Sequence, residues 1–300
     1  MMPMDLLSDD TNLYSITPYC NGGRLLDRLE RKGRFSEPEA RHWMRQILKV
    51  RNAGRRRVIS SVVSFSFPSW NTPTAFVHSP KMYARILRIF VRFSSDNAEH
   101  PPPPDGAQGL SCLKRAGVAH RDMSPENLMV HGDNVYIIDL GMCLRIPSSL
   151  HDDDDVVPDY DADDPADRYR RDQRRRPASR RRSLILPQTP CGKWYYLSPE
   201  VCLSERPFDG PAVDLWAAGV ILFVMLTGSP PWEEPRLEDD NFRLMTTGHM
   251  GRMLEERVAG LSADAMDLLQ SMLFLDPADR LSLEQVRAHP WMTHREHIIE

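Results

Sequence analysis

The chain has 300 residues, of which 41% are hydrophobic and 27% charged, and its formal net charge at pH 7 is −4. This apolar content is enough to bury a core, so wholesale disorder is excluded, and the small negative charge gives no global reason to expect a nucleic-acid partner. Five cysteines lie scattered without a C-x-x-C pair or a ligand-like histidine, which favours a reducing compartment over a disulfide framework or a zinc site: Cys20, Cys112, Cys143, Cys191 and Cys202.

The first residues, "MMPMDLLSDD", contain no basic region and no long apolar run, so they do not resemble a secretory signal. We therefore expect an intracellular protein, cytoplasmic or nuclear. From residue 9 to residue 49 the pattern predicts a short strand ("NLYSITPY"), a Gly-Gly turn and two helices with apolar residues at helical spacing.

Residues 50–108 break this pattern with "RRR", "SSVVSFSFPSW" and "PPPP", and have no consistent periodicity. If they are removed, "RHWMRQILK" joins "GLSCLKRAGVAHRD" in one amphipathic helix. Our hypothesis is a retained intron read in frame, and the alternative is a genuine surface loop or disordered insertion.

The stretch "HRDMSPEN", residues 120–127, sets chemistry-bearing residues on one loop. Phosphoryl transfer needs a carboxylate to orient and accept the proton of the attacking hydroxyl, and oxygen ligands for magnesium. Asp122 suits the first role, and Asn127 with Asp139 suits the second. The intervening "NLMVHGDNVYIID" predicts a β-hairpin that would hold the amide and the second carboxylate on neighbouring strands facing one cleft.

Residues 151–183 contain an acidic block beside a basic one, with few apolar residues, and are predicted to be a disordered insertion. A nuclear-localisation or nucleic-acid role for its arginines stays an alternative, although the adjacent aspartates can neutralise them. Further on, "LWAAGVILFVMLTG" is too short to span a bilayer, so we expect a buried core helix and no membrane partner.

The loop is followed in order by "DLG" (139–141), "SPE" (198–200), "DLWAAG" (214–219) and "DPADR" (276–280). With these motifs the chain resembles the C-terminal lobe of a protein kinase of the Ser/Thr type, similar to the calcium/calmodulin-dependent group. The resemblance implies an α+β kinase-like fold, mainly the helical C-lobe with a hinge strand and small β-hairpins. The kinase domain would cover residues 1–49 and 109–292, followed by a tail at 293–300.

By this resemblance Asp122 is the catalytic base, Asn127 and Asp139 are the magnesium ligands, and residues 139–200 form the activation segment, lengthened by its insertion. The structural residues that it implies act in two groups. His120 and Arg121 directly precede the base, and Asp214 would begin the central helix and accept hydrogen bonds from the backbone of the loop. Glu200 and Arg280 would form a buried ion pair.

The stretch "LYSITPYCNGG" resembles the kinase hinge that holds the adenine of ATP. The resemblance makes Thr17 the gatekeeper, the Pro18 carbonyl and the Cys20 amide the adenine partners, and Met129 the floor of the pocket. Arg24 departs from the family pattern, because kinases often place an acidic residue there for the ribose. The implied cofactors are ATP and Mg²⁺.

Two further departures concern Ser124 and Lys193. Ser/Thr kinases place a lysine two residues after the catalytic aspartate and a threonine in the activation segment, whereas here serine and lysine stand at those positions. We interpret this as an exchange that keeps one hydroxyl and one ammonium near the γ-phosphate, so that Asp122, Ser124 and Lys193 form the catalytic set. The alternative is two unrelated losses.

The glycine-rich loop, strand lysine and helix glutamate of the small lobe do not precede the hinge stretch. We therefore expect either a truncated sequence or a half-kinase, with impaired activity in this chain. The predicted function is protein serine/threonine kinase, acting on a Ser or Thr hydroxyl of a protein substrate. The alternative is a catalytically inactive scaffold, and a metal hydrolase is disfavoured because no H-E-x-x-H spacing is present.

Overall fold

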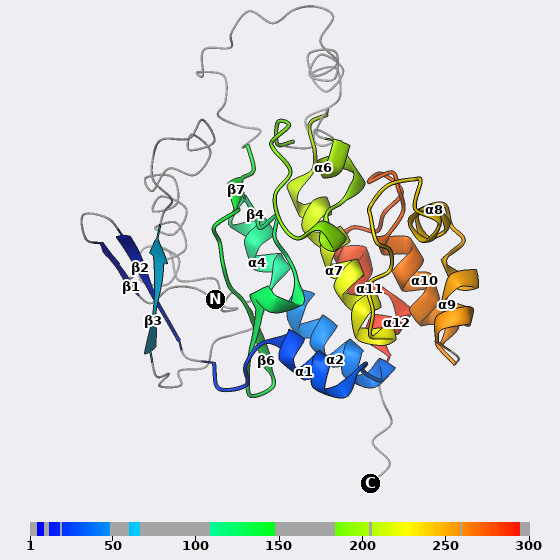
Figure 1. Ribbon diagram of the computed structural model, residues 1–300, viewed down its shortest axis with the longest axis horizontal. Helices are drawn as coiled ribbons and strands as arrows, with labels where there is room; N and C mark the ends of the chain where they lie inside the picture. The colour runs from blue at the N-terminus through cyan, green and yellow to red at the C-terminus, as the bar shows by residue number, and fades with distance from the viewer. Residues whose placement is uncertain are drawn as a thin grey trace, which may run out of the picture.

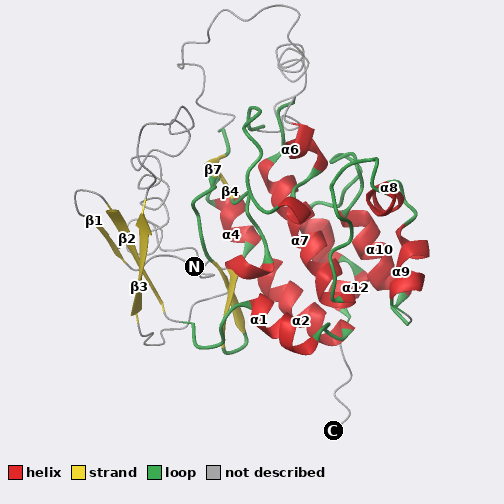
Figure 2. Cartoon of the chain, in the orientation of Figure 1, coloured by secondary structure: helices red, strands yellow, loops and turns green. Residues whose placement is uncertain are grey.

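The computed structural model describes residues 5–8, 12–18, 20–48, 60–66, 109–147, 184–203, 206–258 and 260–294. The predicted insertion at 151–183, most of the segment 50–108 and the tail beyond His294 lie outside these residues. The described part is mainly helical, with short strands gathered toward one end of the molecule (Figures 1 and 2).

The N-terminal strands form an antiparallel sheet in the order β1 (Asp5–Ser8), β2 (Asn12–Pro18) and β3 (Ser60–Ser66). Strand β2 is the predicted hinge strand. Strand β3 lies inside the segment 50–108, where the sequence analysis expected no element, and it pairs along the whole of β2. The β-branched Val62 and Val63 and the aromatic Phe65 are residue types that favour a strand.

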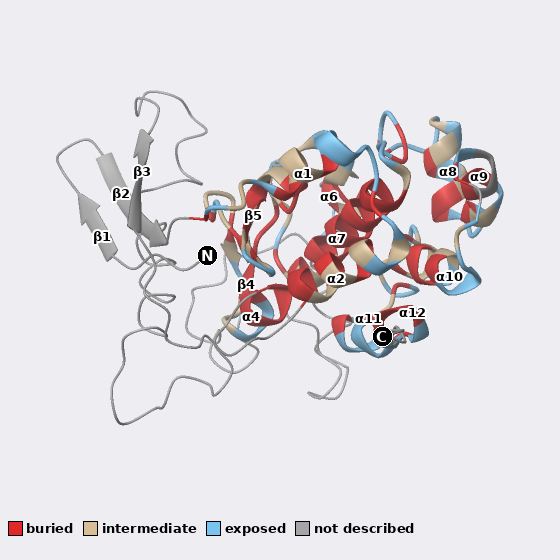
Figure 3. Cartoon of the chain, turned by 90° about the horizontal axis from the view of Figure 1, so that it is seen from below, coloured by how far each residue is buried: buried red, intermediate tan, exposed pale blue. Residues whose placement is uncertain are grey.

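Helix α7 (Gly210–Thr227) is the centre of the helical lobe. It is long and apolar enough to cross a membrane by length and composition, but 83% of that window is buried inside the protein. Helices α2 (Glu37–Leu48), α4 (Leu110–Arg115) and α10 (Ala263–Met272) pack against it. Figure 3 shows α7 buried along most of its length, which is why its sequence lacks a polar face.

Asp214 does not begin this helix, contrary to the expectation from the sequence. Helix α7 starts at Gly210, and the carboxylate of Asp209 caps it by accepting a hydrogen bond from the Ala212 amide at 3.4 Å. Pro211 in the first turn needs no amide partner, which is why the helix can begin there. Asp214 lies one turn further in, where its carboxylate is buried and free to hold another segment.

The end of α2 and the start of α4 meet, although the segment 50–108 separates them in the sequence. The Ser111 hydroxyl donates a hydrogen bond of 2.6 Å to the Leu48 carbonyl, one of the C-terminal carbonyls that a helix cannot satisfy internally. The two stretches that the sequence suggested as one helix are therefore adjacent in space. Whether the segment is an intron stays a hypothesis.

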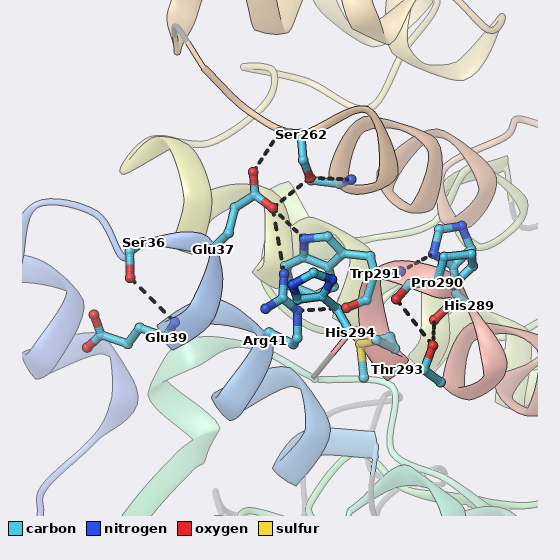
Figure 4. Close-up of polar contacts among 12 residues, drawn as sticks. Ser36, Glu37, Glu39, Arg41, Ser262, His289, Pro290, Trp291, Thr293 and His294 are labelled. Atoms are coloured by element: carbon cyan, nitrogen blue, oxygen red, sulfur yellow. Dashed lines mark hydrogen bonds and ion pairs between the residues drawn. The ribbon is translucent and has the colours of Figure 1, made fainter. Parts of the chain in front are cut away.

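Helix α1 (Leu25–Lys32) precedes α2, and four further helices complete the far side of the lobe: α8 (Asp240–Thr246), α9 (Met250–Arg257), α11 (Leu283–Ala288) and α12 (Pro290–Thr293). Figure 4 shows how α2 is tied to α10 and α12 through Glu37. Its carboxylate accepts hydrogen bonds from the Ser262 amide at 2.6 Å, the Ser262 hydroxyl at 2.7 Å and the Trp291 indole at 2.8 Å.

The predicted hairpin is confirmed. Strands β5 (Leu128–His131) and β6 (Asn134–Ile137) pair with His131 opposite Asn134, which leaves the two-residue turn Gly132–Asp133. A second short pair joins β4 (Val118–Ala119) to β7 (Leu144–Arg145). These two pairs bracket residues 120–127 and 138–143, so they hold both loops of the candidate site.

Candidate active site

The carboxylate of Asp214 holds the start of the loop that begins at His120. The two carboxylate oxygens accept hydrogen bonds from the backbone amides of His120 and Arg121, at 2.7 and 2.8 Å. Arg121 has a φ of 68°, a conformation that costs a non-glycine residue strain and persists only where the surroundings fix it. Burial raises the pKa of Asp214 to about 7, and the two amide hydrogen bonds offset this only in part. The predicted contact is present.

His120 is fully buried and links the loop to the hairpin. Its Nδ1 accepts a hydrogen bond from the Asp122 amide at 3.3 Å, and its Nε2 lies 3.0 Å from the Ile138 carbonyl. An amide can only donate and a carbonyl can only accept, so the proton lies on Nε2. Burial lowers the pKa of His120 to about 4. The imidazole is therefore a neutral structural strut between Asp122 and the strand that leads to Asp139.

The carboxylate of Asp122 is oriented from two sides. The Asn127 amide nitrogen donates to the Asp122 backbone carbonyl at 2.7 Å and to Oδ2 at 2.9 Å, and the Lys193 backbone amide donates to Oδ1 at 3.2 Å. Only 14% of the Asp122 side chain is exposed. A carboxylate fixed in this way can hold and deprotonate a hydroxyl group presented from solvent.

Ser124 and Lys193, two of the departures from the family pattern, are in contact. The Lys193 ammonium donates to Ser124 Oγ at 2.8 Å and lies 3.5 Å from Asp122 Oδ2. Lys193 precedes the 3₁₀ turn Trp194–Tyr196, far from the loop in sequence. The structure thus brings together all three residues that the sequence analysis assigned to the catalytic set.

Asn127 and Asp139 lie at the ends of neighbouring strands, because the Ile138 amide donates to the Asn127 carbonyl at 2.9 Å. Asp139 is exposed, has a φ of 60° and accepts a hydrogen bond from the Gly141 amide at 3.1 Å through Oδ1. The Asn127 amide nitrogen is used by Asp122, so Oδ1 of Asn127 is left as an acceptor. An amide oxygen and a carboxylate with free lone pairs are donors that Mg²⁺ accepts, so these residues fit the ion.

The hinge stretch reaches the hairpin through its two glycines. The Gly22 amide donates to the Val130 carbonyl at 2.9 Å, and the Val130 amide donates to the Gly23 carbonyl at 2.8 Å. A Cβ on Gly22 would lie 2.6 Å from that Val130 carbonyl oxygen, so the approach requires glycine. Arg24, the residue after these glycines, forms a β-bridge with Met129 in β5. Burial raises the pKa of the Cys20 thiol to about 11, so it stays protonated.

Thr17 and Pro18 occupy the last two positions of β2, and their side chains lie outside the described residues. Arg24, which stands where an acidic residue was expected, pairs instead with Asp27 at the start of α1, with Nη2 2.6 Å from Oδ1. The Asp27 carboxylate also accepts a hydrogen bond from the Arg24 backbone amide at 2.9 Å, so the pair closes the first turn of α1 and the local role of the guanidinium is structural.

Glu200 and Arg280 form the predicted ion pair. Nη1 lies 2.7 Å from Oε1 and Nη2 lies 2.8 Å from Oε2, with only 2% of the arginine side chain exposed. The pair joins α6 (Pro199–Leu203) to the loop before α11. It fixes the end of the segment that carries Lys193.

Gly192 matches the family pattern in sequence, but neither its packing role nor that of Glu126 was predicted. A Cβ on Gly192 would lie 2.7 Å from the Arg121 carbonyl oxygen and 3.3 Å from Asp122 Oδ1. The signal was present, since the glycine directly precedes Lys193. Glu126 has a buried carboxylate oxygen without a hydrogen-bond partner among the described residues, and Glu126 and burial both raise the pKa of the nearby Tyr196, burial more strongly.

Comparison with known proteins agrees with this geometry. The model of the protein kinase domain matches residues 106–292. An Aurora kinase of Yarrowia lipolytica is 32% identical over 188 residues, which cover 62% of this chain and 39% of that protein. The serine/threonine-protein kinase CHK1 of Mycosarcoma maydis is 29% identical over 184 residues, which cover 61% of this chain and 22% of that protein.

A third relative, CBL-interacting protein kinase 21 of Oryza sativa subsp. japonica, is 25% identical over 288 residues, which cover 96% of this chain and 36% of that protein. The chain thus spans well under half the length of these curated relatives. The ordered motifs, the geometry around Asp122 and the match over residues 106–292 lead to one conclusion: the chain belongs to the protein kinase domain family.

Proposed function

We propose that this chain carries the catalytic loop and activation segment of a protein serine/threonine kinase that uses ATP and Mg²⁺. The observation that supports the proposal best is the way in which the Asp122 carboxylate is held and exposed. Its carboxylate is held by the side chain of Asn127 and by the backbone amide of Lys193, yet the residue keeps a solvent-facing edge. A purely structural aspartate at this place would need no such opening.

In the proposed reaction Asp122 orients the Ser or Thr hydroxyl of a protein substrate. The hydroxyl oxygen attacks the γ-phosphorus of ATP, the bond between that phosphorus and the β–γ bridging oxygen breaks, and ADP leaves. The hydroxyl proton passes to the Asp122 carboxylate. Asn127 has two tasks here, since its amide nitrogen fixes Asp122 while its oxygen remains available.

Magnesium, held by Asn127 Oδ1 and the Asp139 carboxylate, would neutralise phosphate charge when bound. On the nucleotide side, the Gly-Gly turn that follows Cys20 contacts β5, the strand that carries Met129, which agrees with an adenine pocket between hinge and hairpin. Thr17 and Pro18 complete this pocket in the proposal.

A catalytically inactive scaffold is the second candidate. Ser124 favours it, because a serine cannot supply the positive charge that a lysine offers at this position of a Ser/Thr kinase loop. A scaffold would need the ion pair of Glu200 with Arg280 and the buried lobe, but not the preserved arrangement around Asp122.

The test is phosphate transfer by the full-length protein that carries this domain, with radiolabelled ATP and peptide pools that offer Ser, Thr or Tyr as the acceptor. We expect transfer to Ser or Thr, abolished by Asp122→Asn. Asp133→Asn, in the exposed hairpin turn, is the matched control and should keep the wild-type rate. Nucleotide binding without transfer to any pool would favour the scaffold and contradict the proposal.

A further inference from the structure

The ammonium group nearest to Asp122 comes from the activation segment and not from the catalytic loop. Lys193 Nζ lies 2.8 Å from Ser124 Oγ and 3.5 Å from Asp122 Oδ2. An ammonium has three N–H donors. Ser124 takes one and Asp122 faces the second, and the lysine side chain is 37% exposed, so a donor remains for a group that enters from solvent.

Ser124 is suited to orient this ammonium but not to replace it. The serine is fully buried. Its backbone carbonyl accepts a hydrogen bond from the Asn127 backbone amide at 3.0 Å, and this bond fixes the loop from Ser124 to Asn127. Its hydroxyl is neutral and accepts a hydrogen bond from the lysine ammonium. The cation therefore has a fixed anchor on the loop while the charge itself lies on another segment.

The lysine does not remove the carboxylate from use. An ionised carboxylate has about four acceptor positions, and among the described residues two hydrogen bonds occupy those of Asp122, one from the Asn127 side-chain amide and one from the Lys193 backbone amide. The ammonium at 3.5 Å is beyond hydrogen-bond distance from Oδ2. A hydroxyl that approaches Asp122 would thus find an acceptor position, with the ammonium beside it.

We propose that Lys193 supplies, from the activation segment, the positive charge that binds the transferring γ-phosphoryl group, with Ser124 as its positioning residue. This inference rests on the proposed kinase function. A substrate hydroxyl held by Asp122 brings the γ-phosphate next to that carboxylate, within reach of Nζ. A fixed cation there stabilises the negative charge on the phosphoryl oxygens.

The placement couples the charge to the position of the segment. Two contacts hold residues 189–193 on the catalytic loop: the Lys193 backbone amide donates to Asp122 Oδ1 at 3.2 Å, and Arg121 Nη2 donates to the Thr189 carbonyl at 3.3 Å. A lysine on the catalytic loop would remain at the site when this segment moves. Lys193 leaves with it, so the site gains its phosphate cation only when the segment is docked.

The experiment compares four forms of the full-length protein: wild type, Lys193→Thr, Ser124→Lys and the double exchange of both. Calorimetry gives the equilibrium affinities for ATP and for ADP, which differ by the γ-phosphate, and transfer assays give kcat. Lys193→Thr should weaken ATP relative to ADP by about tenfold, the value of a hydrogen bond to a charged group, and lower kcat by about 100-fold. The double exchange should restore both.

Two controls separate charge from folding. Lys193→Arg keeps a cation and should keep the preference for ATP over ADP. Lys114→Thr removes a lysine that pairs with Glu284 on the surface, and should change neither quantity.

An unchanged ATP preference and kcat in Lys193→Thr would overturn the inference alone, as would a loss that the double exchange does not restore. A wild type that neither binds ATP nor transfers phosphate would overturn the kinase function as well.

Discussion

Arg280 holds Glu200 through two parallel hydrogen bonds, of 2.7 and 2.8 Å, and so ties the end of the activation segment to the core. The guanidinium is itself fixed, because Nε donates to the Phe274 carbonyl at 2.7 Å and the group stacks over the Trp216 ring at 4.5 Å. A charge with this many partners is stable in a buried position, but each partner depends on the others.

Replacing Arg280 by alanine should therefore destabilise the domain strongly. The change leaves the Glu200 carboxylate, of which 13% is exposed, without its partner, and breaking a buried pair costs about 3–5 kcal/mol. Thermal or urea unfolding of the full-length protein measures it. Lys114→Ala is the matched control, because the pair with Glu284 is exposed and should be worth about 1 kcal/mol or less. Equal losses in the two variants would contradict the importance of burial.

His120 and Asp214 have opposite effects on the pH dependence of stability. Asp214 has a pKa of about 7 in the folded chain against 3.8 in the unfolded one, so its contribution favours folding at low pH and is lost as the pH rises from about 4 to 7. His120 has a pKa of about 4 against 6.5, so its contribution is complete above pH 6.5 and is lost as the pH falls toward 4. Between about pH 4 and 6.5 the two contributions to the free energy of unfolding change in opposite directions and largely cancel.

In Asp214→Asn the pH dependence of stability that His120 causes should become measurable. Asparagine does not titrate, so the free energy of unfolding of this variant should fall as the pH is lowered from about 6.5 to 5, on the way to a full loss of about 3 kcal/mol. The wild type should stay nearly flat over this range. Urea unfolding at several pH values compares the slopes, which are informative even though the variant is also less stable at pH 7. A wild type with the same acid slope would show that Asp214 is ionised in the folded chain.

The residues of the candidate site were predicted from the sequence better than the elements that hold them in place. The hairpin follows from two apolar runs around a turn, whereas the set of Asp122 with Ser124 and Lys193 and the pair of Glu200 with Arg280 follow from the resemblance of the ordered motifs to a protein kinase. The role of Asp209 as the helix cap was missed, since an aspartate five residues later in a more conspicuous motif drew the assignment to Asp214. Local capping depends on which turn begins first, and periodicity does not resolve that.

The strand β3 and the close approach at Gly192 could not be read from pattern alone. Pairing of β3 with β2 depends on a partner more than forty residues away in sequence, and strand propensity depends strongly on such context. The requirement for glycine at 192 comes from the Arg121 carbonyl, which only the folded chain brings near. The roles assigned to Thr17 and Pro18 remain predictions.

Gly192→Ala should disturb the docked segment. Gly192 has a φ of +103°, where side chains are strained, and a Cβ would lie 2.7 Å from the Arg121 carbonyl oxygen. We expect a cost of about 1–3 kcal/mol in stability and a lower rate of phosphate transfer, because Lys193 is the next residue. Gly251→Ala in α9 is the control, since a Cβ there meets nothing within 4 Å and alanine favours a helix. Unfolding and transfer rates should differ clearly between the two variants.

Trp291 joins two kinds of interaction that substitutions can separate (Figure 4). Its indole nitrogen donates to Glu37 at 2.8 Å, its carbonyl accepts from Arg41 Nε at 2.6 Å, and its ring lies under the Arg41 guanidinium at 4.9 Å. The side chain is 1% exposed. The ring fills the space between α2 and α12, whereas the indole nitrogen contributes a hydrogen bond to a carboxylate that Ser262 also satisfies.

Trp291→Phe should cost about 1–2 kcal/mol of stability, because it keeps most of the ring and loses one hydrogen bond. Trp291→Ala should cost about 3–5 kcal/mol through the cavity that it leaves.

The pH dependence of stability that the Glu37 carboxylate causes gives a second readout. Burial alone would raise its pKa, but the hydrogen bonds from Ser262 and Trp291 lower it below the usual 4.5. Its contribution to stability is therefore present above pH 4.5 and lost as the pH falls through the lowered value. The loss in acid should be smaller in Trp291→Phe, and an unchanged acid profile in urea unfolding would show that the indole does not help to hold Glu37.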